Sequence, residues 1–206
     1  MTITLWQLLV YAAAMAGLWA VPGPVWVALL ARALSGGFAS AWPLAVGVVL
    51  GDLLWPAIAI FGLSWIVSVY SGFIHLLKIV AAVTFAVMGL MLIRKSGTLL
   101  TADSRLTKPG RLAGFMTGIA AVIGNPKAIL FYMGVLPGFF DLASLNRADT
   151  VAILSVSAAV PLAGNLGLAL FLSSARSLLS SPARVQTLNR IAGGLLLIVA
   201  VAILLT

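Results

Sequence analysis

The sequence predicts an all-α protein whose helices cross a membrane six times. Of its 206 residues, 63% are hydrophobic and only 8% are charged, whereas a soluble domain has roughly 25% charged residues. Apolar stretches of about 20 residues recur along the whole chain, and each is long enough to cross a hydrocarbon layer about 30 Å thick. A soluble protein of this composition would lack the polar surface that faces water.

Turn residues separate the apolar stretches into six expected spans. These spans cover residues 5–31, 41–66, 73–93, 112–137, 150–172 and 190–206. The residues before the first span include no Lys or Arg, so the basic segment that opens a secretory signal peptide is missing. We therefore expect the first span to remain in the protein as a helix.

The distribution of Lys and Arg among the loops predicts how the spans are oriented in the membrane. The loops after the first, third and fifth spans contain or border nine of them: Arg32, Arg94, Lys95, Arg105, Lys108, Arg111, Arg176, Arg184 and Arg190. The loops after the second and fourth spans have only Arg147. Because cytoplasmic loops are enriched in Lys and Arg, we expect a bacterial inner (cytoplasmic) membrane protein whose two termini are both periplasmic.

The same composition argues against several other classes. The net charge of +8 comes from residues between apolar spans, and no basic stripe interleaved with aromatic residues suggests nucleic-acid binding. The chain has no Cys, which removes disulfides and thiolate metal sites. A buried serine nucleophile or a metal ion would need partners that the spans do not group together, so no enzyme, no catalytic residue and no metal site is predicted.

The halves of the chain resemble each other weakly. The loop Arg94–Arg111 leaves three spans on each side, so the sequence predicts a single transporter domain made of half one (1–95), a cytoplasmic loop (96–111) and half two (112–206). Three short similarities occur in the same order in both halves: Gly23-Pro24 with Asn125-Pro126, Gly51–Leu53 with Gly164–Leu166, and Gly89–Ile93 with Gly194–Ile198. Because three is odd, the halves must be inserted in opposite orientations, as an inverted repeat.

Helix breaks occur in matching spans of the two halves. Pro22, Gly23 and Pro24 interrupt span one, and Pro126 interrupts span four. Proline lacks an N–H and clashes with the preceding turn, so Pro22 frees the carbonyl of Leu18 for another partner. Paired breaks of this kind point to the solute site of a transporter. Two kinks that serve only helix packing would give the same pattern in the sequence.

Asp52 and Lys127 are the deepest charges, about 17 and 22 Å from the cytoplasmic starts of their spans at 1.5 Å per residue. Charges at such depth face the protein interior and pair or take part in function, so we expect these two to be coupled across the halves. In a regular helix Asn125 and Lys127 would point about 200° apart, so both face a site only if the backbone around Pro126 is unwound. Asn165 corresponds to Asp52 in the repeat.

Small residues one turn apart predict close helix contacts; they are Gly47 with Gly51 and Gly164 with Gly167. Tryptophans inside spans are consistent both with ordinary packing and with lining a solute cavity; they are Trp19, Trp26 and Trp55.

Together these segments resemble the LysE/RhtB family of bacterial amino-acid exporters. The similar segments are Pro22–Pro24, Gly47–Asp52, Lys78 with Gly89–Arg94, Gly124–Ala128 followed by Leu130-Phe131 and Leu136-Pro137, and Leu188–Arg190 leading into Gly193-Gly194. Two positions depart from the family pattern. Val25 stands where relatives often have a polar residue, and Thr84 and Val87 lie where relatives often have tyrosines.

The resemblance implies export of amino acids or close analogues, driven by the proton motive force and without a cofactor. Its departures leave room for a less polar solute. The solute would bind between the two breaks, to Pro22, Gly23, Pro24, Asn125, Pro126, Lys127 and Asn165, and Asp52 would couple transport to protons. The implied partners are this small-molecule substrate, protons and the lipid bilayer. Whether the protein forms a homo-oligomer is left open by the resemblance.

Two other functions remain as alternatives. An exporter of metal or other inorganic ions of a related fold would need more buried acidic or histidine side chains than this sequence provides. A membrane scaffold that transports nothing would have a solid, dry interior.

Overall fold

The computed structural model describes residues 2–69, 73–94 and 109–174, together with isolated helical residues between 183 and 201. Every regular element in these ranges is a helix, and none is a strand, which confirms the predicted all-α class. Within the expected sixth span, 190–206, the described residues are scattered between 190 and 201 and all are helical, and most of the expected cytoplasmic loop, 96–111, falls outside the described residues.

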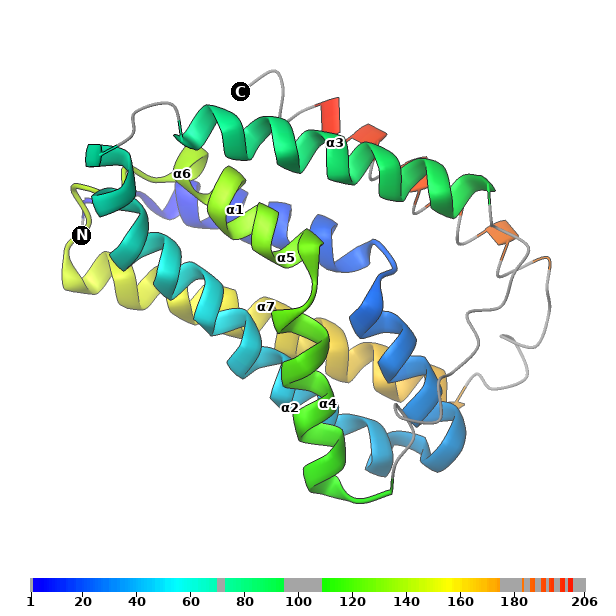
Figure 1. Ribbon diagram of the computed structural model, residues 1–206. Coiled ribbons are helices and arrows are strands. Elements are labelled where there is room, and N and C mark those ends of the chain that lie inside the picture. The colour runs from blue at the N-terminus through cyan, green and yellow to red at the C-terminus, as the bar shows by residue number, and fades with distance from the viewer. Residues whose placement is uncertain are drawn as a thin grey trace.

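The described helices follow one another along the chain as shown in Figure 1. They are α1 (Leu5–Ala20), α2 (Pro24–Val69), α3 (Phe73–Arg94), α4 (Arg111–Ile123), α5 (Pro126–Leu130), the π-helix η1 (Phe131–Val135), α6 (Leu136–Phe139) and α7 (Arg147–Ser174).

The first five expected spans overlap these helices, and two of the five are bent. α2 turns back on itself at Gly36 and Gly37, and Gly37 has a φ of 68°, which glycine adopts without strain. The first span combines α1 with Pro24–Ala33 at a bend of 61°, and the fourth combines Arg111–Ile123 with Pro126–Phe139 at 51°. By length and composition, two described helices could cross a membrane, or four segments if each bent pair is one span.

Glycines bring α2 and α4 into direct backbone contact. A Cβ atom on Gly47 would lie 2.0 Å from the carbonyl oxygen of Phe115, and one on Gly118 would lie 2.2 Å from that of Leu44. No side chain fits at either position, so the packing predicted for Gly47 is confirmed. The same expectation is wrong for Gly167, because a Cβ there would have no atom of the described residues within 4 Å.

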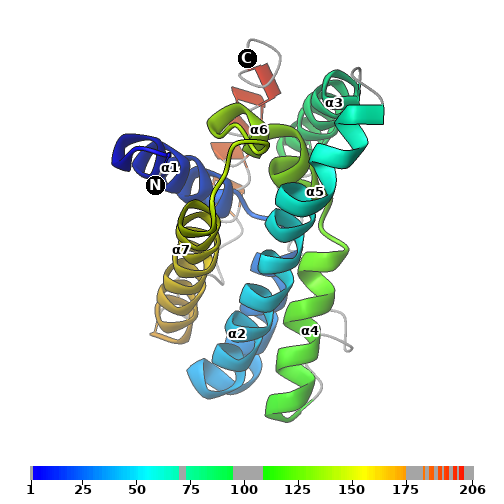
Figure 2. The ribbon, with the colours of Figure 1, turned by 90° about the vertical axis from the view of Figure 1, so that its left-hand side faces the viewer.

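Helices α1 and α7 lie side by side and run parallel, joined by polar contacts in a constant register (Figures 1 and 2). The contacts are Thr2 to Asp149 at 2.6 Å between side chains, Tyr11 to Ser157 at 2.7 Å, and Trp19 to Asn165 at 3.0 Å. Partners are 146 or 147 residues apart each time, so the two helices form one unit.

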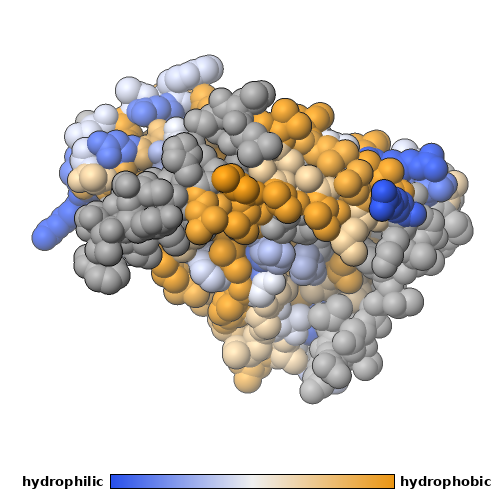
Figure 3. Space-filling view, turned by 45° about the horizontal axis from the view of Figure 1, so that its top comes forward, coloured by the Kyte–Doolittle hydropathy of each residue, from blue (hydrophilic) through white to orange (hydrophobic). Residues whose placement is uncertain are grey.

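The outer surface suits a lipid environment. Large apolar side chains are exposed on several helices, such as Trp6 (73%), Phe61 (71%) and Leu112 (73%). In Figure 3 an apolar band crosses the face shown, and hydrophilic residues gather toward both ends of that band. This arrangement, together with the apolar helices, is that of a multi-pass membrane protein.

At one end of the bundle, Arg32 joins the turn of α2 to the start of α4. Its Nε donates to the carbonyl of Ser40 at 2.8 Å, and its Nη2 donates to the carbonyl of Gly110 at 3.0 Å. The turn after the first expected span therefore lies at the same end of the molecule as the start of the fourth.

Candidate functional site

The first helix break lies between α1 and α2. Helix α1 ends at Ala20 because Pro22 and Pro24 cannot donate the hydrogen bonds that would extend it. Val21 is extended, with φ −77° and ψ 120°. Pro24 then opens α2, where its fixed φ is tolerated in the first turn.

The second break lies between α4 and α5. Asn125 is extended, with φ −89° and ψ 104°, and its Oδ1 accepts a hydrogen bond from the backbone N–H of Lys127 at 3.2 Å. Asn125 thus caps α5, and Pro126 is the first residue of that helix. The unwinding expected around Pro126 is present, and it lets Asn125 and Lys127 line the same cavity.

Lys127 joins the two breaks. Its Nζ donates to the carbonyl of Leu18 at 2.8 Å and to the carbonyl of Val21 at 2.7 Å, and the side chain is only 5% exposed. A cation at the carboxyl end of α1 is favourable because the free carbonyls there carry partial negative charge. The carbonyl that Pro22 was expected to free is therefore held by Lys127, with Gly23 leaving room beside the amine.

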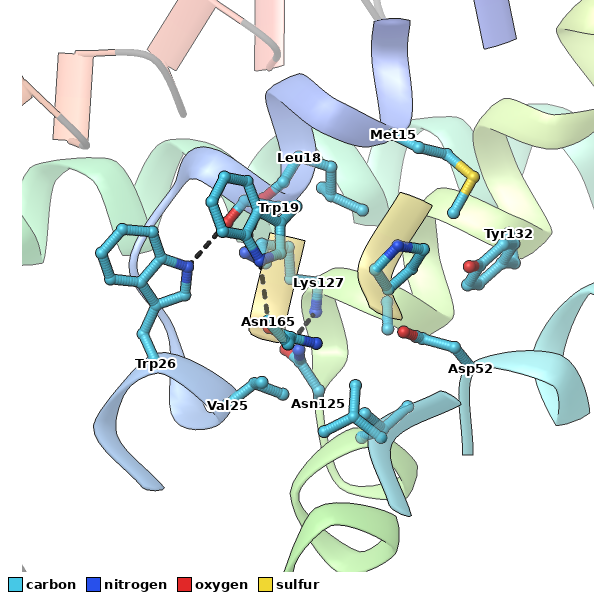
Figure 4. A pocket seen from close by; sticks show the side chains of 14 residues that line it. Met15, Leu18, Trp19, Val25, Trp26, Asp52, Asn125, Lys127, Tyr132 and Asn165 are labelled. Atoms are coloured by element: carbon cyan, nitrogen blue, oxygen red, sulfur yellow. Dashed lines mark hydrogen bonds between the residues drawn. The ribbon is translucent and has the colours of Figure 1, made fainter. Parts of the chain in front are cut away.

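A cavity lies where the two breaks meet, and Figure 4 shows it from close by. It offers about 50 Å³ to the centres of water-sized molecules, which is room for a few waters. Its lining combines apolar side chains with a few polar groups: Met15, Leu18, Trp19, Val25, Trp26, Val48, Asp52, Val122, Asn125, Lys127, Ala128, Tyr132, Pro161 and Asn165.

Asp52 faces this cavity from α2 and is 8% exposed. Within the described part of the chain, no hydrogen bond or ion pair joins Asp52 to another side chain. Asp52 and Lys127 attract each other electrostatically, but the amine of Lys127 contacts carbonyls of α1 instead of the carboxylate. The two deep charges thus share one cavity without direct contact.

Two tryptophans connect the first break to α7. The indole N–H of Trp26 donates to the carbonyl of Trp19 at 2.7 Å, and the indole N–H of Trp19 donates to Oδ1 of Asn165 at 3.0 Å. Of the alternatives left open for the buried tryptophans, Trp19 and Trp26 line the cavity, whereas Trp55 is not among its lining residues.

Of the residues predicted for the site, four line the cavity: Asp52, Asn125, Lys127 and Asn165. The other four shape the breaks around it: Pro22, Gly23, Pro24 and Pro126.

Tyr132 is a cavity residue that the sequence did not indicate. It lies five residues after Lys127, which in a regular α-helix would place it about 140° away around the axis. The π-helix η1, which contains Tyr132, changes that spacing, and such turns occur often at functional sites. Proline at 137 is a weak hint of irregularity, but nothing in the sequence indicates the π-turn itself.

Comparison with known proteins identifies the family. The family model described as "LysE type translocator" matches residues 16–206, which is most of the chain. The chain belongs to this LysE family. A LysE-family chain is a membrane transporter, and the family resemblance seen in the sequence is confirmed.

Among curated proteins, this LysE-family chain is similar to the uncharacterized membrane protein slr1627 of Synechocystis sp.. The two are 28% identical over 190 residues, which cover 91% of this chain and 90% of the relative. No solved structure matches the chain.

Proposed function

We propose that this LysE-family transporter exports amino acids or closely related small solutes from the cytoplasm, driven by the proton motive force. The observation that carries the proposal is a single cavity, at the meeting point of two broken helices, that brings together Asp52, Lys127 and Asn165. An amino acid carries an ammonium and a carboxylate. A site with buried groups of both signs can pair with both ends of such a solute. Without these partners, charges would be costly to bury in the membrane.

The proposed mechanism is alternating access. The solute enters from the cytoplasm, binds between the break at Pro22–Pro24 and the break at Asn125–Lys127, and leaves on the periplasmic side. Asp52 is the carboxylate that takes up and releases the proton. The cavity of about 50 Å³ admits a few waters, so it must widen to take up a larger amino acid.

The other two functions have less support. An exporter of metal ions is expected to gather ligands, and the described residues contain no group of three or more His, Cys, Asp or Glu that could hold a metal ion. A scaffold is expected to have a dry interior. The polar cavity beside Lys127 favours transport instead.

The proposal is tested by overproducing the protein in bacteria and screening for excretion of, or resistance to, individual amino acids and their analogues. The wild type should excrete one or a few of them. The double variant Pro22→Ala/Pro24→Ala should remain in the membrane, because helical hydrogen bonds can form across the break, but it should lose export by at least about 10-fold. A continuous helix would remove the free carbonyls that face Lys127.

Pro43→Ala is the matched control, because Pro43 lies inside α2 and belongs to neither of the two helix breaks. It should export normally. A wild type that excretes none of these solutes would contradict the proposed function. Normal export by the double proline variant would show that the first break only bends the helix.

We further propose that both termini are periplasmic. The contact between Arg32 and Gly110 supports this, because it places parts of the first and third loops at one end of the molecule, as the positive-inside pattern requires. Reporter fusions at Ala102 should behave as cytoplasmic, and fusions at Leu145 should behave as periplasmic. The opposite result would reverse the proposed orientation.

A further inference from the structure

We propose that Trp19 holds the side-chain amide of Asn165 in one orientation, so that its NH₂ group is presented to the cavity as the donor for the carboxylate of the solute. Asn165 is then the residue that binds the carboxylate, and Trp19 is a positioning residue that acts through it. The inference rests on the proposed function and deepens it, because it assigns the carboxylate of the solute to Asn165.

The first observation is an unpaired donor. Asn165 is only 1% exposed and lines the cavity from α7. Its Oδ1 accepts the bond from Trp19, whereas its Nδ2 is buried and has no hydrogen-bond partner among the residues that the structure describes. Buried polar groups in folded proteins are nearly always paired, so an unpaired amide on a cavity wall indicates that a ligand supplies the missing acceptor.

The second observation fixes which atom of the amide faces the cavity. An indole nitrogen can donate a hydrogen bond but cannot accept one, whereas an asparagine side chain has one oxygen acceptor and one nitrogen donor. If the amide of Asn165 were flipped, two donors would face each other at Trp19. The network therefore assigns the oxygen to Trp19 and leaves the NH₂ for the cavity.

The third observation is that Trp19 is itself held in place. A Cβ on Gly164 would lie 2.6 Å from ring atom Cε2 of Trp19, so the indole lies directly against the backbone of α7. The ring of Trp26 packs against Trp19 at 5.6 Å between centroids, and its N–H donates to the carbonyl of Trp19. The glycine that admits the ring comes immediately before Asn165, the residue that the ring orients.

The distribution of charge around the cavity identifies the ligand group. Figure 4 shows Asn165 on the same side of the cavity as Lys127, whereas Asp52 and Tyr132 lie on the other side. A donor beside a cation suits an anionic oxygen, and an unpaired carboxylate suits an ammonium. The solute carboxylate thus points toward Asn165, and its ammonium points toward Asp52.

Asn165→Asp tests this assignment, because one aspartate oxygen can still accept from Trp19 while the other replaces the NH₂ with an acceptor. Binding to the purified protein would be measured with three probes of similar size: L-alanine, propionate, which lacks the ammonium, and ethylamine, which lacks the carboxylate. We expect Asn165→Asp to weaken binding of L-alanine and propionate about 10- to 100-fold, as for loss of one hydrogen bond to a charged group. Binding of ethylamine should be unchanged or tighter.

Trp19→Phe tests the positioning role. It keeps an aromatic ring against Gly164 but removes the N–H, so the amide of Asn165 can rotate. The ratio of propionate affinity to ethylamine affinity should fall about 3- to 10-fold. A merely structural role for Trp19 would weaken all three probes equally and leave that ratio unchanged.

Two control variants should bind all three probes like the wild type. Trp6→Phe removes an indole N–H from α1 at a position that is 73% exposed. Gln7→Glu makes the same amide-to-carboxylate change outside the cavity, at the residue that pairs with the α1 cap Thr4.

The outcomes separate this inference from the proposed function. If the cells export no amino acid but propionate binding still depends on Asn165, the proposed function fails and the carboxylate site stands. If amino acids are exported while Asn165→Asp binds all probes like the wild type, or loses all of them equally, the inference is overturned and the function stands. Failure of wild-type protein to bind either L-alanine or propionate also overturns the inference.

Discussion

Replacing Lys127 by Met is expected to lower the amount of folded protein in the membrane and to abolish export. The substitution removes both hydrogen bonds from Nζ. The carbonyl of Leu18 keeps a weaker bond from the N–H of Val21 at 3.3 Å, but the carbonyl of Val21 loses its partner. An unsatisfied buried acceptor costs about 1–3 kcal/mol. Quantitative blotting of membranes and the excretion assay measure the two effects.

Asp52→Asn should behave differently. Lys127 keeps its carbonyl partners in that variant, so abundance should stay near the wild-type level, while export is lost because an amide cannot carry the proton. If the two side chains were in direct contact, Lys127→Met would leave the charge of Asp52 buried without its partner. The double variant Asp52→Asn/Lys127→Met would then be more abundant than Lys127→Met, because no unpaired charge remains.

With Lys127 held by α1, the double variant should remain as scarce as Lys127→Met. Recovery of its abundance would contradict this expectation and would show that the two charges pair directly in the membrane. Arg147→Met removes a positive charge from an exposed position at the start of α7 and should leave abundance and export unchanged.

Gly118→Ala is expected to lower the stability of the folded protein strongly. Its methyl group would lie 2.2 Å from the carbonyl oxygen of Leu44 and 2.8 Å from the backbone nitrogen of Val48. Neither atom belongs to a flexible side chain, so α2 and α4 must separate along their contact. We expect a loss of about 3 kcal/mol or more in the free energy of unfolding, at the upper end of the range for overpacked cores.

Thermal unfolding of the purified protein in detergent measures this loss, and Gly167→Ala is the matched control. Gly167 is also inside a helix, but its added methyl group would meet no atom within 4 Å in the part of the chain that the structure describes. That control should be neutral or slightly more stable, since alanine favours helices over glycine. Equal stability of Gly118→Ala and the wild type would show that α2 and α4 are not in backbone contact in the membrane.

The helix breaks could be predicted from the sequence because their cause is local. Pro22 and Pro126 cannot donate backbone hydrogen bonds in any fold, so a break near each follows from residue chemistry alone. The deep position of Asp52 could be predicted for a similar reason, since depth follows from counting residues along a span.

The partners across the cavity could not be predicted, because they depend on how distant segments meet. Lys127 is 109 residues from Leu18 and 106 from Val21, and nothing local indicates that its amine binds backbone carbonyls. The role of Trp19 depends in the same way on the position of α7. Gly164 and Gly167 look alike in the sequence, but within the described ranges only Gly164 has another helix's side chain against it.

The constant register of α1 and α7 has a consequence for synthesis. Tyr11 and Trp19 are made 146 residues before Ser157 and Asn165, and at about 5–20 residues per second this delay is roughly 7 to 30 seconds. During this delay the ribosome holds a chain whose first helix lacks its final polar partners. Lys127 has no such delay, because the carbonyls that receive its amine are already synthesised when it emerges. Lys127, whose amine is the costliest group to leave unpaired in lipid, is thus translated after the carbonyls that accept its hydrogen bonds.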